Sequence, residues 1–215
     1  MIKAIVLLSG GIDSSVALWW AKNKWEVYAL TFEFSKSNRN EVNAARKLSK
    51  NAKVENHLII DVNFLKQISE LKQLRKNPLI NKLHMPSTYI PSRNTVFFGV
   101  ASYFSDILDA RYIITGHIST DPFPDSKPKY VKAVNAALAY GSWLGKKYKT
   151  KIVMPFSKMD KISVLKSALK LKVPLELTWS CHKNIKIACG KCSGCNSRLD
   201  AFEAINLEDK ISYNL

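Results

Sequence analysis

A chain of 215 residues with 47% hydrophobic residues is long enough for one domain with a buried core and a small appendage. No run reaches the roughly 18 apolar residues of a membrane span, and Gly10, Gly11 and Asp13 interrupt an apolar N-terminus that otherwise resembles a signal peptide, so we expect a cytosolic protein. The net charge of +16 suggests nucleic acid, but only six of the 33 basic residues are Arg, which favours a lysine-rich composition or an anionic small substrate over direct tRNA binding.

Short apolar segments alternate with helix-like ones along the chain. We predict strands at 3–8, 26–32, 55–62, 111–115 and 151–155. We predict helices at 14–23, 40–51, about 64–73, 95–108, about 130–145 and about 159–171. This alternation indicates an α/β domain with a parallel sheet. Two proline-containing loops, 74–92 and 117–128, are expected to emerge from one edge of the sheet and to carry function.

The turn between the first strand and the first helix has the sequence Ser-Gly-Gly-Ile-Asp-Ser-Ser. A strand that runs through glycines into a helix points backbone N–H groups and the positive end of the helix dipole at one spot, which suits phosphate. Neither a Walker loop nor a dinucleotide fingerprint is present. The alternative is an ordinary glycine turn with serine at the helix start.

This hexapeptide, SGGIDS, resembles the pyrophosphate loop of the N-type ATP pyrophosphatases. The resemblance implies an adenine nucleotide alpha hydrolase-like (PP-loop) three-layer sandwich. It also implies that the loop holds the β- and γ-phosphates of ATP while an acceptor oxygen attacks the α-phosphate. The residues expected to bind ATP are Leu8, Ser9, Gly10, Gly11, Ile12, Asp13, Ser14 and Ser15.

All four cysteines fall within fifteen residues near the C-terminus, with the spacing C-x7-C-x2-C-x2-C. Four thiolates make a closed tetrahedral zinc site that folds a loop too small for its own core. An iron–sulfur cluster and four unligated thiols are the alternatives. His182 follows the first cysteine and is expected to lie outside the metal's ligand set. The predicted ligands are Cys181, Cys189, Cys192 and Cys195.

Three segments together resemble the 7-cyano-7-deazaguanine synthases: LLSGGIDSS at 7–15, PSRNTVFFGVASYF at 91–104, and the cysteine-containing stretch at 173–205. The resemblance implies conversion of 7-carboxy-7-deazaguanine and ammonia to the nitrile preQ0, through adenylated acid and amide, for queuosine or archaeosine. It further implies ATP, Mg²⁺ and Zn²⁺ as cofactors and a homodimer. The corresponding division is an ATP pyrophosphatase domain, 1–178, and a zinc-binding element with a helix, 179–215.

Five side chains are candidates for catalysis beside the phosphate loop. Arg93 opens a helix and can neutralise charge on the α-phosphate, although a surface arginine is the alternative. The loop at 117–130 departs from the common family pattern. For its charged residues Asp121 and Lys127, solvated loop charges are therefore the alternative to contacts with substrate or phosphate. Trp179 either stacks on the deazapurine or supports the cysteine loop. The candidates are Asp13, Arg93, Asp121, Asp125 and Lys127, of which the carboxylates could hold Mg²⁺.

Two other function classes fit parts of the sequence. A tRNA-thiolating pyrophosphatase would use the positive charge, but no cysteine lies outside the terminal cluster to carry sulfur. A zinc module without catalytic activity would bind nucleotide and release no pyrophosphate. We therefore expect an ATP-dependent carbon–nitrogen ligase, with the tRNA-thiolating enzyme as the alternative.

Overall fold

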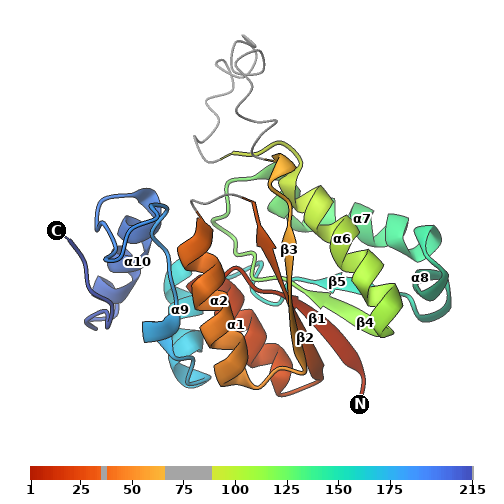
Figure 1. Cartoon of the computed structure of the whole chain (residues 1–215), viewed down its shortest axis with the longest axis horizontal. Coiled ribbons are helices and arrows are strands. Elements are labelled where there is room, and N and C mark those ends of the chain that lie inside the picture. The colour runs from red at the N-terminus through yellow and green to blue at the C-terminus, as the bar shows by residue number, and fades with distance from the viewer. Residues whose placement is uncertain (35–37, 66–88, 215) are drawn as a thin grey trace, which may run out of the picture.

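The computed structural model describes residues 1–34, 38–65 and 89–214. Its centre is a parallel sheet of five strands in the order β3-β2-β1-β4-β5 (Figure 1). The predicted parallel sheet is therefore confirmed, with strand ends that differ by one or two residues from the prediction. The strands are β1 (Lys3–Leu7), β2 (Glu26–Glu33), β3 (Asn56–Asp61), β4 (Ala110–Ile114) and β5 (Lys151–Val153).

Helices cover both faces of the sheet and make a three-layer sandwich (Figure 1). One layer contains α1 (Ile12–Lys22), α2 (Arg39–Ala52) and α9 (Lys161–Lys170), and the opposite layer contains α6 (Arg93–Leu108), α7 (Pro128–Gly141) and α8 (Trp143–Tyr148). Within β1, Ala4 and Val6 belong to the core under the first layer, whereas Ile5 belongs to the core under the second. A strand buried on both faces reads as a continuous apolar run, as 3–8 does.

The structure differs from the predicted elements at a few places. The single helix predicted at about 130–145 is two helices, α7 and α8, because Ser142 is extended and its hydroxyl accepts a hydrogen bond from the Gly145 amide at 2.8 Å. The strand predicted at 151–155 ends at Val153. The helix predicted at about 64–73 lies outside the described residues beyond Leu65, as does most of the loop predicted at 74–92.

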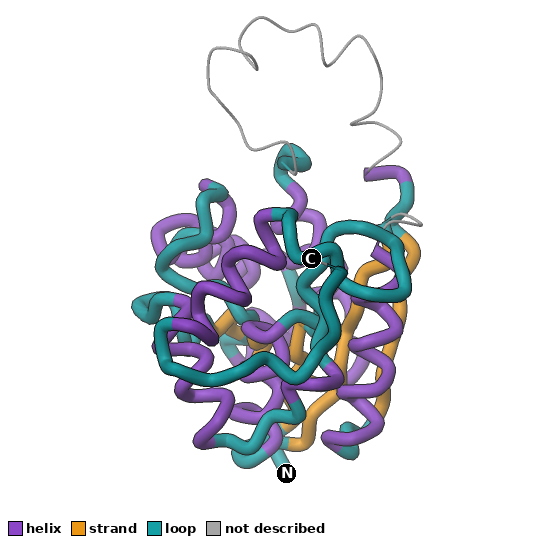
Figure 2. Tube along the Cα trace, turned by 90° about the vertical axis from the view of Figure 1, so that its left-hand side faces the viewer, coloured by secondary structure: helices purple, strands orange, loops and turns teal. Residues whose placement is uncertain are grey.

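The C-terminal segment forms a separate small cluster against α9, at the end of the molecule away from α8 (Figure 1). It comprises a short 3₁₀ turn, η3 (Leu175–Leu177), the cysteine loop and α10 (Ser193–Glu203), and it faces the viewer in Figure 2. Within the described ranges, no helix is both long and apolar enough to span a bilayer. The division of the chain at residue 178 stays a prediction.

A buried ion pair ties the end of the chain to this cluster. The Arg198 side chain has no exposed surface, and its Nε and Nη2 donate to the two carboxylate oxygens of Asp209 at 2.5 and 2.8 Å. The same guanidinium donates to the hydroxyl of Thr178 and the carbonyl of Leu175. The Tyr213 hydroxyl donates to Asp209 as well, so the tail is fixed by charge-assisted hydrogen bonds.

Candidate active site

The predicted phosphate loop lies between the end of β1 and the start of α1, packed closely against its neighbours. Gly10 has φ of +93°, and a Cβ atom there would lie 2.2 Å from the carbonyl oxygen of Glu41 in α2. Gly116, after β4, is also in close contact, because a Cβ there would lie 2.6 Å from the amide nitrogen of Ser14. Glycine at both positions lets three parts of the chain meet where the central strands end.

Serine hydroxyls organise the loop. The hydroxyls of Ser9 and Ser14 are 3.0 Å apart, and the Ser9 hydroxyl accepts from the Gly11 amide at 3.3 Å. Ser15 is fully buried, and its hydroxyl donates to the Gly11 carbonyl at 2.7 Å, so it stabilises the start of α1 from within the core. The Leu8 side chain is likewise in the core. A cavity of about 190 Å³ opens at the loop, and it is lined there by Ser9, Gly11, Ile12, Asp13 and Ser14.

Asp13 has a partner that the sequence did not reveal. Lys161, the first residue of α9, places its Nζ 2.8 Å from both carboxylate oxygens of Asp13, and both side chains are partly exposed to the cavity. The two residues are 148 positions apart, and Lys161 follows Asp160, which caps its helix by accepting from the Ser163 amide. The ammonium group of Lys161 therefore lies beside the loop, on the wall of the cavity, where it is available to a phosphate as well as to Asp13.

Arg93 lies at the start of α6, among carboxylates from three parts of the chain. Burial lowers the pKa of its guanidinium, and the charges of Asp125, Glu41 and Asp121 oppose that shift without cancelling it. Its guanidinium stands 5.5 Å from the ring centre of Phe123 and is half-buried. Arg93 is therefore close to the acidic groups and does not behave as an ordinary surface arginine.

The other predicted catalytic residues serve the local structure in this arrangement. Asp125 is buried and accepts from the backbone amide and side-chain amide of Asn94 at 2.9 and 3.0 Å, which caps α6. Lys127 donates to the carbonyls of Ser119 and Asp121. Asp121 accepts from the Ile118 amide at 3.1 Å. Within the loop at 117–128, Lys127 therefore holds the backbone at Ser119 and Asp121, and Asp125 ties the loop to the start of α6.

Glu41 also lines the cavity, from the first turn of α2, and the sequence did not single it out. Burial raises the pKa of its carboxyl to about 7, against the attraction of Arg93. Burial has the opposite effect on His117, lowering the pKa of its ring to about 4, because the ring is a base. A carboxyl with a pKa near neutrality can accept and release protons under ordinary conditions.

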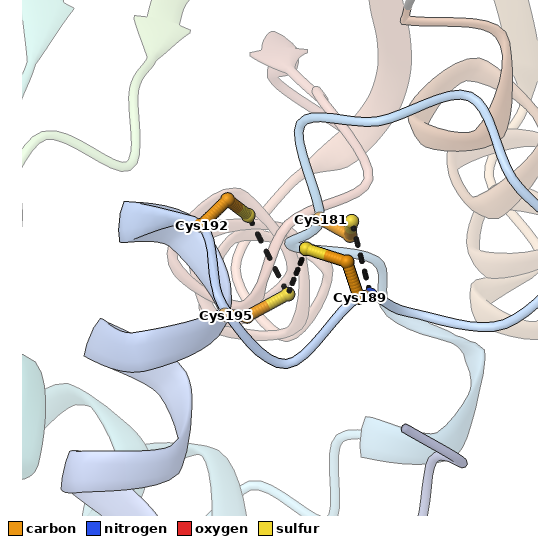
Figure 3. Close-up of side chains that lie close together, drawn as sticks. All are labelled: Cys181, Cys189, Cys192 and Cys195. Atoms are coloured by element: carbon orange, nitrogen blue, oxygen red, sulfur yellow. Dashed lines mark hydrogen bonds between the residues drawn. The ribbon is translucent and has the colours of Figure 1, made fainter. Parts of the chain in front are cut away.

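The four cysteine sulfurs of the C-terminal cluster lie within 4.8 Å of one another (Figure 3). The Cys192 and Cys195 sulfurs are 3.5 Å apart and those of Cys189 and Cys195 are 3.9 Å apart. Four thiolates about 2.3 Å from a tetrahedral zinc ion would be separated by about 3.8 Å, whereas a disulfide needs about 2 Å. The donor set fits zinc, and the amides of Lys183 and Cys189 already donate to the Cys181 sulfur.

No comparable group exists for magnesium among the residues that the structure describes. Across these ranges, the only set of three or more His, Cys, Asp or Glu ligand atoms close enough to share one ion is the cysteine cluster. Asp13 is paired with Lys161, and both oxygens of Asp125 hold the start of α6. The predicted carboxylates therefore do not form a preformed Mg²⁺ site.

Trp179 joins the cysteine cluster to the phosphate loop. Its backbone amide donates to the Gly10 carbonyl at 2.9 Å, and its indole Nε1 donates to the Cys181 carbonyl at 2.8 Å. It also lines the cavity, together with His182 and Gly194 from the C-terminal cluster. These contacts fit a residue that supports the cysteine loop, and they make the C-terminal element one wall of the cavity.

Comparisons with known proteins agree with this geometry. Residues 3–206 match the family described as "Queuosine biosynthesis protein QueC". The chain is 34% identical to a 7-cyano-7-deazaguanine synthase of Thermoplasma volcanium, over 99% of this chain and 91% of the relative, and 37% identical to one of Persephonella marina, over 95% and 94%. An NMN synthetase structure from Francisella tularensis superposes with a TM-score of 0.51 at 16% identity, covering 96% of this chain and 77% of that one. The last match supports the adenine nucleotide hydrolase-like fold.

Proposed function

The chain belongs to the QueC family of 7-cyano-7-deazaguanine synthases, ATP-dependent enzymes of queuosine biosynthesis, and from that premise we propose how its cavity performs the reaction. The substrates are 7-carboxy-7-deazaguanine, ammonia and ATP. The observation that carries the proposal is the cavity at the start of α1, where serine hydroxyls, loop amides and the Asp13–Lys161 pair meet.

In the first half of the reaction, the loop holds the β- and γ-phosphates while the substrate carboxylate attacks the α-phosphorus. A P–O bond forms to the carboxylate, and the bond to the bridging oxygen breaks, which releases pyrophosphate. No base is needed, because the attacking group is already an anion. Lys161 and the loop amides stabilise charge on the leaving phosphates. We assign Arg93, at the start of α6 and within the electrostatic influence of Glu41, to charge on the α-phosphate.

The steps on nitrogen do need a proton acceptor. Ammonia attacks the acyl carbon, the bond to AMP breaks, and the nitrogen loses a proton to give the amide. The amide oxygen then attacks the α-phosphorus of a second ATP and expels a second pyrophosphate. Cleavage of the C–O bond releases AMP, and loss of both remaining N–H protons leaves the nitrile. Glu41 is our proposed acceptor, because its carboxyl lines the cavity and burial raises its pKa to about 7.

The metals have different roles in this proposal. Zinc, held by the four cysteines, fixes the wall of the cavity formed by the C-terminal element and takes no part in bond changes. Mg²⁺ would enter with ATP and would neutralise part of its phosphate charge, since the described carboxylates offer it no preformed site. Four thiols kept reduced for zinc suit the cytosol, and a homodimer follows from the family resemblance.

Mass spectrometry of a reaction containing ATP, ammonium and 7-carboxy-7-deazaguanine tests the function. We expect the mass of the nitrile, with AMP and pyrophosphate formed alongside it. Omitting ammonium should leave pyrophosphate release from the carboxylate and abolish the nitrile. No nitrile from well-folded, zinc-loaded protein would overturn the proposal, and sulfur transfer to tRNA under the same conditions would favour the thiolating enzyme.

A further inference from the structure

The positive charge of the chain is concentrated in one region. Residues 126–159 contain eight lysines and no aspartate or glutamate, so this stretch carries half of the net charge of +16. It forms α7, α8 and β5, at the sheet edge away from the C-terminal cluster (Figure 1). This is far more charge than the binding of ATP at the other end of the molecule explains.

Most of these lysines are exposed, and several share one face. Residues three or four positions apart lie on the same side of a helix. One side of α7 therefore carries Lys129, Lys132, Ala136 and Tyr140. Residues of α7 and residues 145–151 line one cavity beside the edge strand β5. We call this surface the lysine edge; its cationic members there are Lys129, Lys132, Lys146, Lys149 and Lys151.

A cavity of about 420 Å³ lies within the lysine edge, between α7, the end of α8 and β5. Lys146, Lys149 and Lys151 line it on one side, and Ala136 and Tyr140 are among the residues on the other. Thr150 also lines it; this residue is buried, and its hydroxyl has no hydrogen-bond partner within the described part of the chain. A buried hydroxyl without a partner is uncommon, and a bound ligand can satisfy it.

Two aromatic side chains of the same stretch of chain are unusually exposed. Tyr140, beside the cavity, is 88% exposed, and Trp143 at the start of α8 is 87% exposed. Nearby, the Tyr148 ring has the Arg111 guanidinium 4.6 Å and the Lys147 ammonium 4.9 Å from its centre. Open aromatic rings among cations are what stacked bases and a phosphate backbone require together.

We propose that the lysine edge binds single-stranded RNA, with one nucleotide in the cavity, neighbouring phosphates on the lysines, and bases stacked on Tyr140 and Trp143. A nucleotide fits a cavity of this size. A second copy of the chain is a poor occupant, because a self-complementary interface would place lysine against lysine. An anionic bilayer would use the charge, but it would not supply a hydrogen-bond partner for the buried Thr150 hydroxyl that lines the cavity.

Fluorescence anisotropy with a labelled uridine 20-mer RNA tests the proposal on the zinc-loaded enzyme. The test variant combines Lys146→Gln, Lys149→Gln and Lys151→Gln. The control combines Lys166→Gln, Lys170→Gln and Lys172→Gln, which removes the same charge from exposed positions on and after α9. Lys149 and Lys172 both have positive φ, so the two variants are also matched in backbone strain.

We expect the test variant to bind RNA about tenfold or more weakly at 0.1 M salt, and its salt dependence to fall by about two logarithmic units per decade, since each lost phosphate contact contributes roughly 0.7. Trp143→Ala should weaken binding roughly five- to hundredfold through lost stacking. Nitrile synthesis should be unchanged in these variants. Equal loss in the test and control variants, no RNA binding by the wild type, or binding to phosphatidylserine vesicles but not to RNA would each overturn the proposal.

Discussion

Replacing Gly10 with alanine tests the packing of the phosphate loop directly. The residue has φ of +93°, and a backbone conformation of this kind costs a residue with a Cβ atom about 1–3 kcal/mol. The added Cβ would also lie 2.2 Å from the carbonyl oxygen of Glu41, so the loop and α2 must separate. Overpacking of this kind costs about 1–3 kcal/mol more, which gives a total of roughly 2–6 kcal/mol.

The matched control is Gly99→Ala in α6, where an added Cβ meets no atom within 4 Å. Alanine is favoured over glycine inside a helix by about 0.5–1 kcal/mol, so this variant should be slightly more stable than the wild type. Thermal unfolding followed by circular dichroism should show a midpoint for Gly10→Ala at least about 4 °C below that of the wild type. This figure follows from the lower estimate of about 2 kcal/mol, since each kcal/mol shifts the midpoint by about 2–4 °C for a chain of this size.

Activity gives the second readout. Pyrophosphate release at a temperature where Gly10→Ala is still folded should fall with the displaced loop, whereas Gly99→Ala should keep the wild-type rate. If Gly10→Ala unfolds at the same temperature as Gly99→Ala and turns over ATP normally, the close approach of the loop to α2 is wrong, and the cavity described at that place is wrong with it.

Four further predictions follow from the site. Lys161→Met should reduce pyrophosphate release by about 10²-fold or more with little change in stability. The control, Lys166→Met at an exposed position of the same helix, should keep the wild-type activity and stability, and equal activities of the two variants would exclude a role for Lys161. Because burial raises the pKa of Glu41 to about 7, the folded state keeps a proton that the unfolded state loses near its ordinary pKa of 4.5, so the free energy of unfolding should fall as pH rises from about 4.5 through 7. Glu41→Gln should remove that decline in melts across this range and slow nitrile formation by about 10²-fold while sparing pyrophosphate release without ammonium; an unchanged pH profile would contradict it. Cys192→Ser should lower bound zinc, measured by atomic emission, together with the stability of the C-terminal element, and full zinc content would refute the ligand assignment. Asp209→Ala leaves a fully buried guanidinium without its counter-charge and should cost about 3–5 kcal/mol in chemical denaturation, far more than an exposed pair would.

The sequence was most informative where one physical demand acts on neighbouring residues. The strand at 3–8 was recognisable because burial imposes apolar side chains on consecutive positions, and the structure has it at Lys3–Leu7. The cysteine cluster was recognisable because its four thiols have the close spacing typical of zinc sites, and the structure brings their sulfurs within 4.8 Å of one another. Each of these signals is local, so no knowledge of the fold was required.

The features that were missed depend on residues far apart in the chain. Lys161 reads as a solvated lysine at a helix start until the fold brings it to Asp13. Glu41 lies in a helix with a polar face, and only its packing against the phosphate loop explains its burial and raised pKa. The break between α7 and α8 depends on the hydrogen bond of the Ser142 hydroxyl to the Gly145 amide, and the spacing of apolar residues does not predict such a bond.

The hydrogen bond from the Trp179 amide to the Gly10 carbonyl has a practical meaning for anyone who shortens this chain. A fragment ending at residue 178 would lack that donor and would leave the Gly10 carbonyl of the predicted phosphate loop without this partner. Metal starvation should act through the same bond, because a loosened cysteine loop takes Trp179 with it. We therefore expect loss of zinc to weaken the affinity for ATP, with the metal acting through the structure of the loop and not on the reacting bonds.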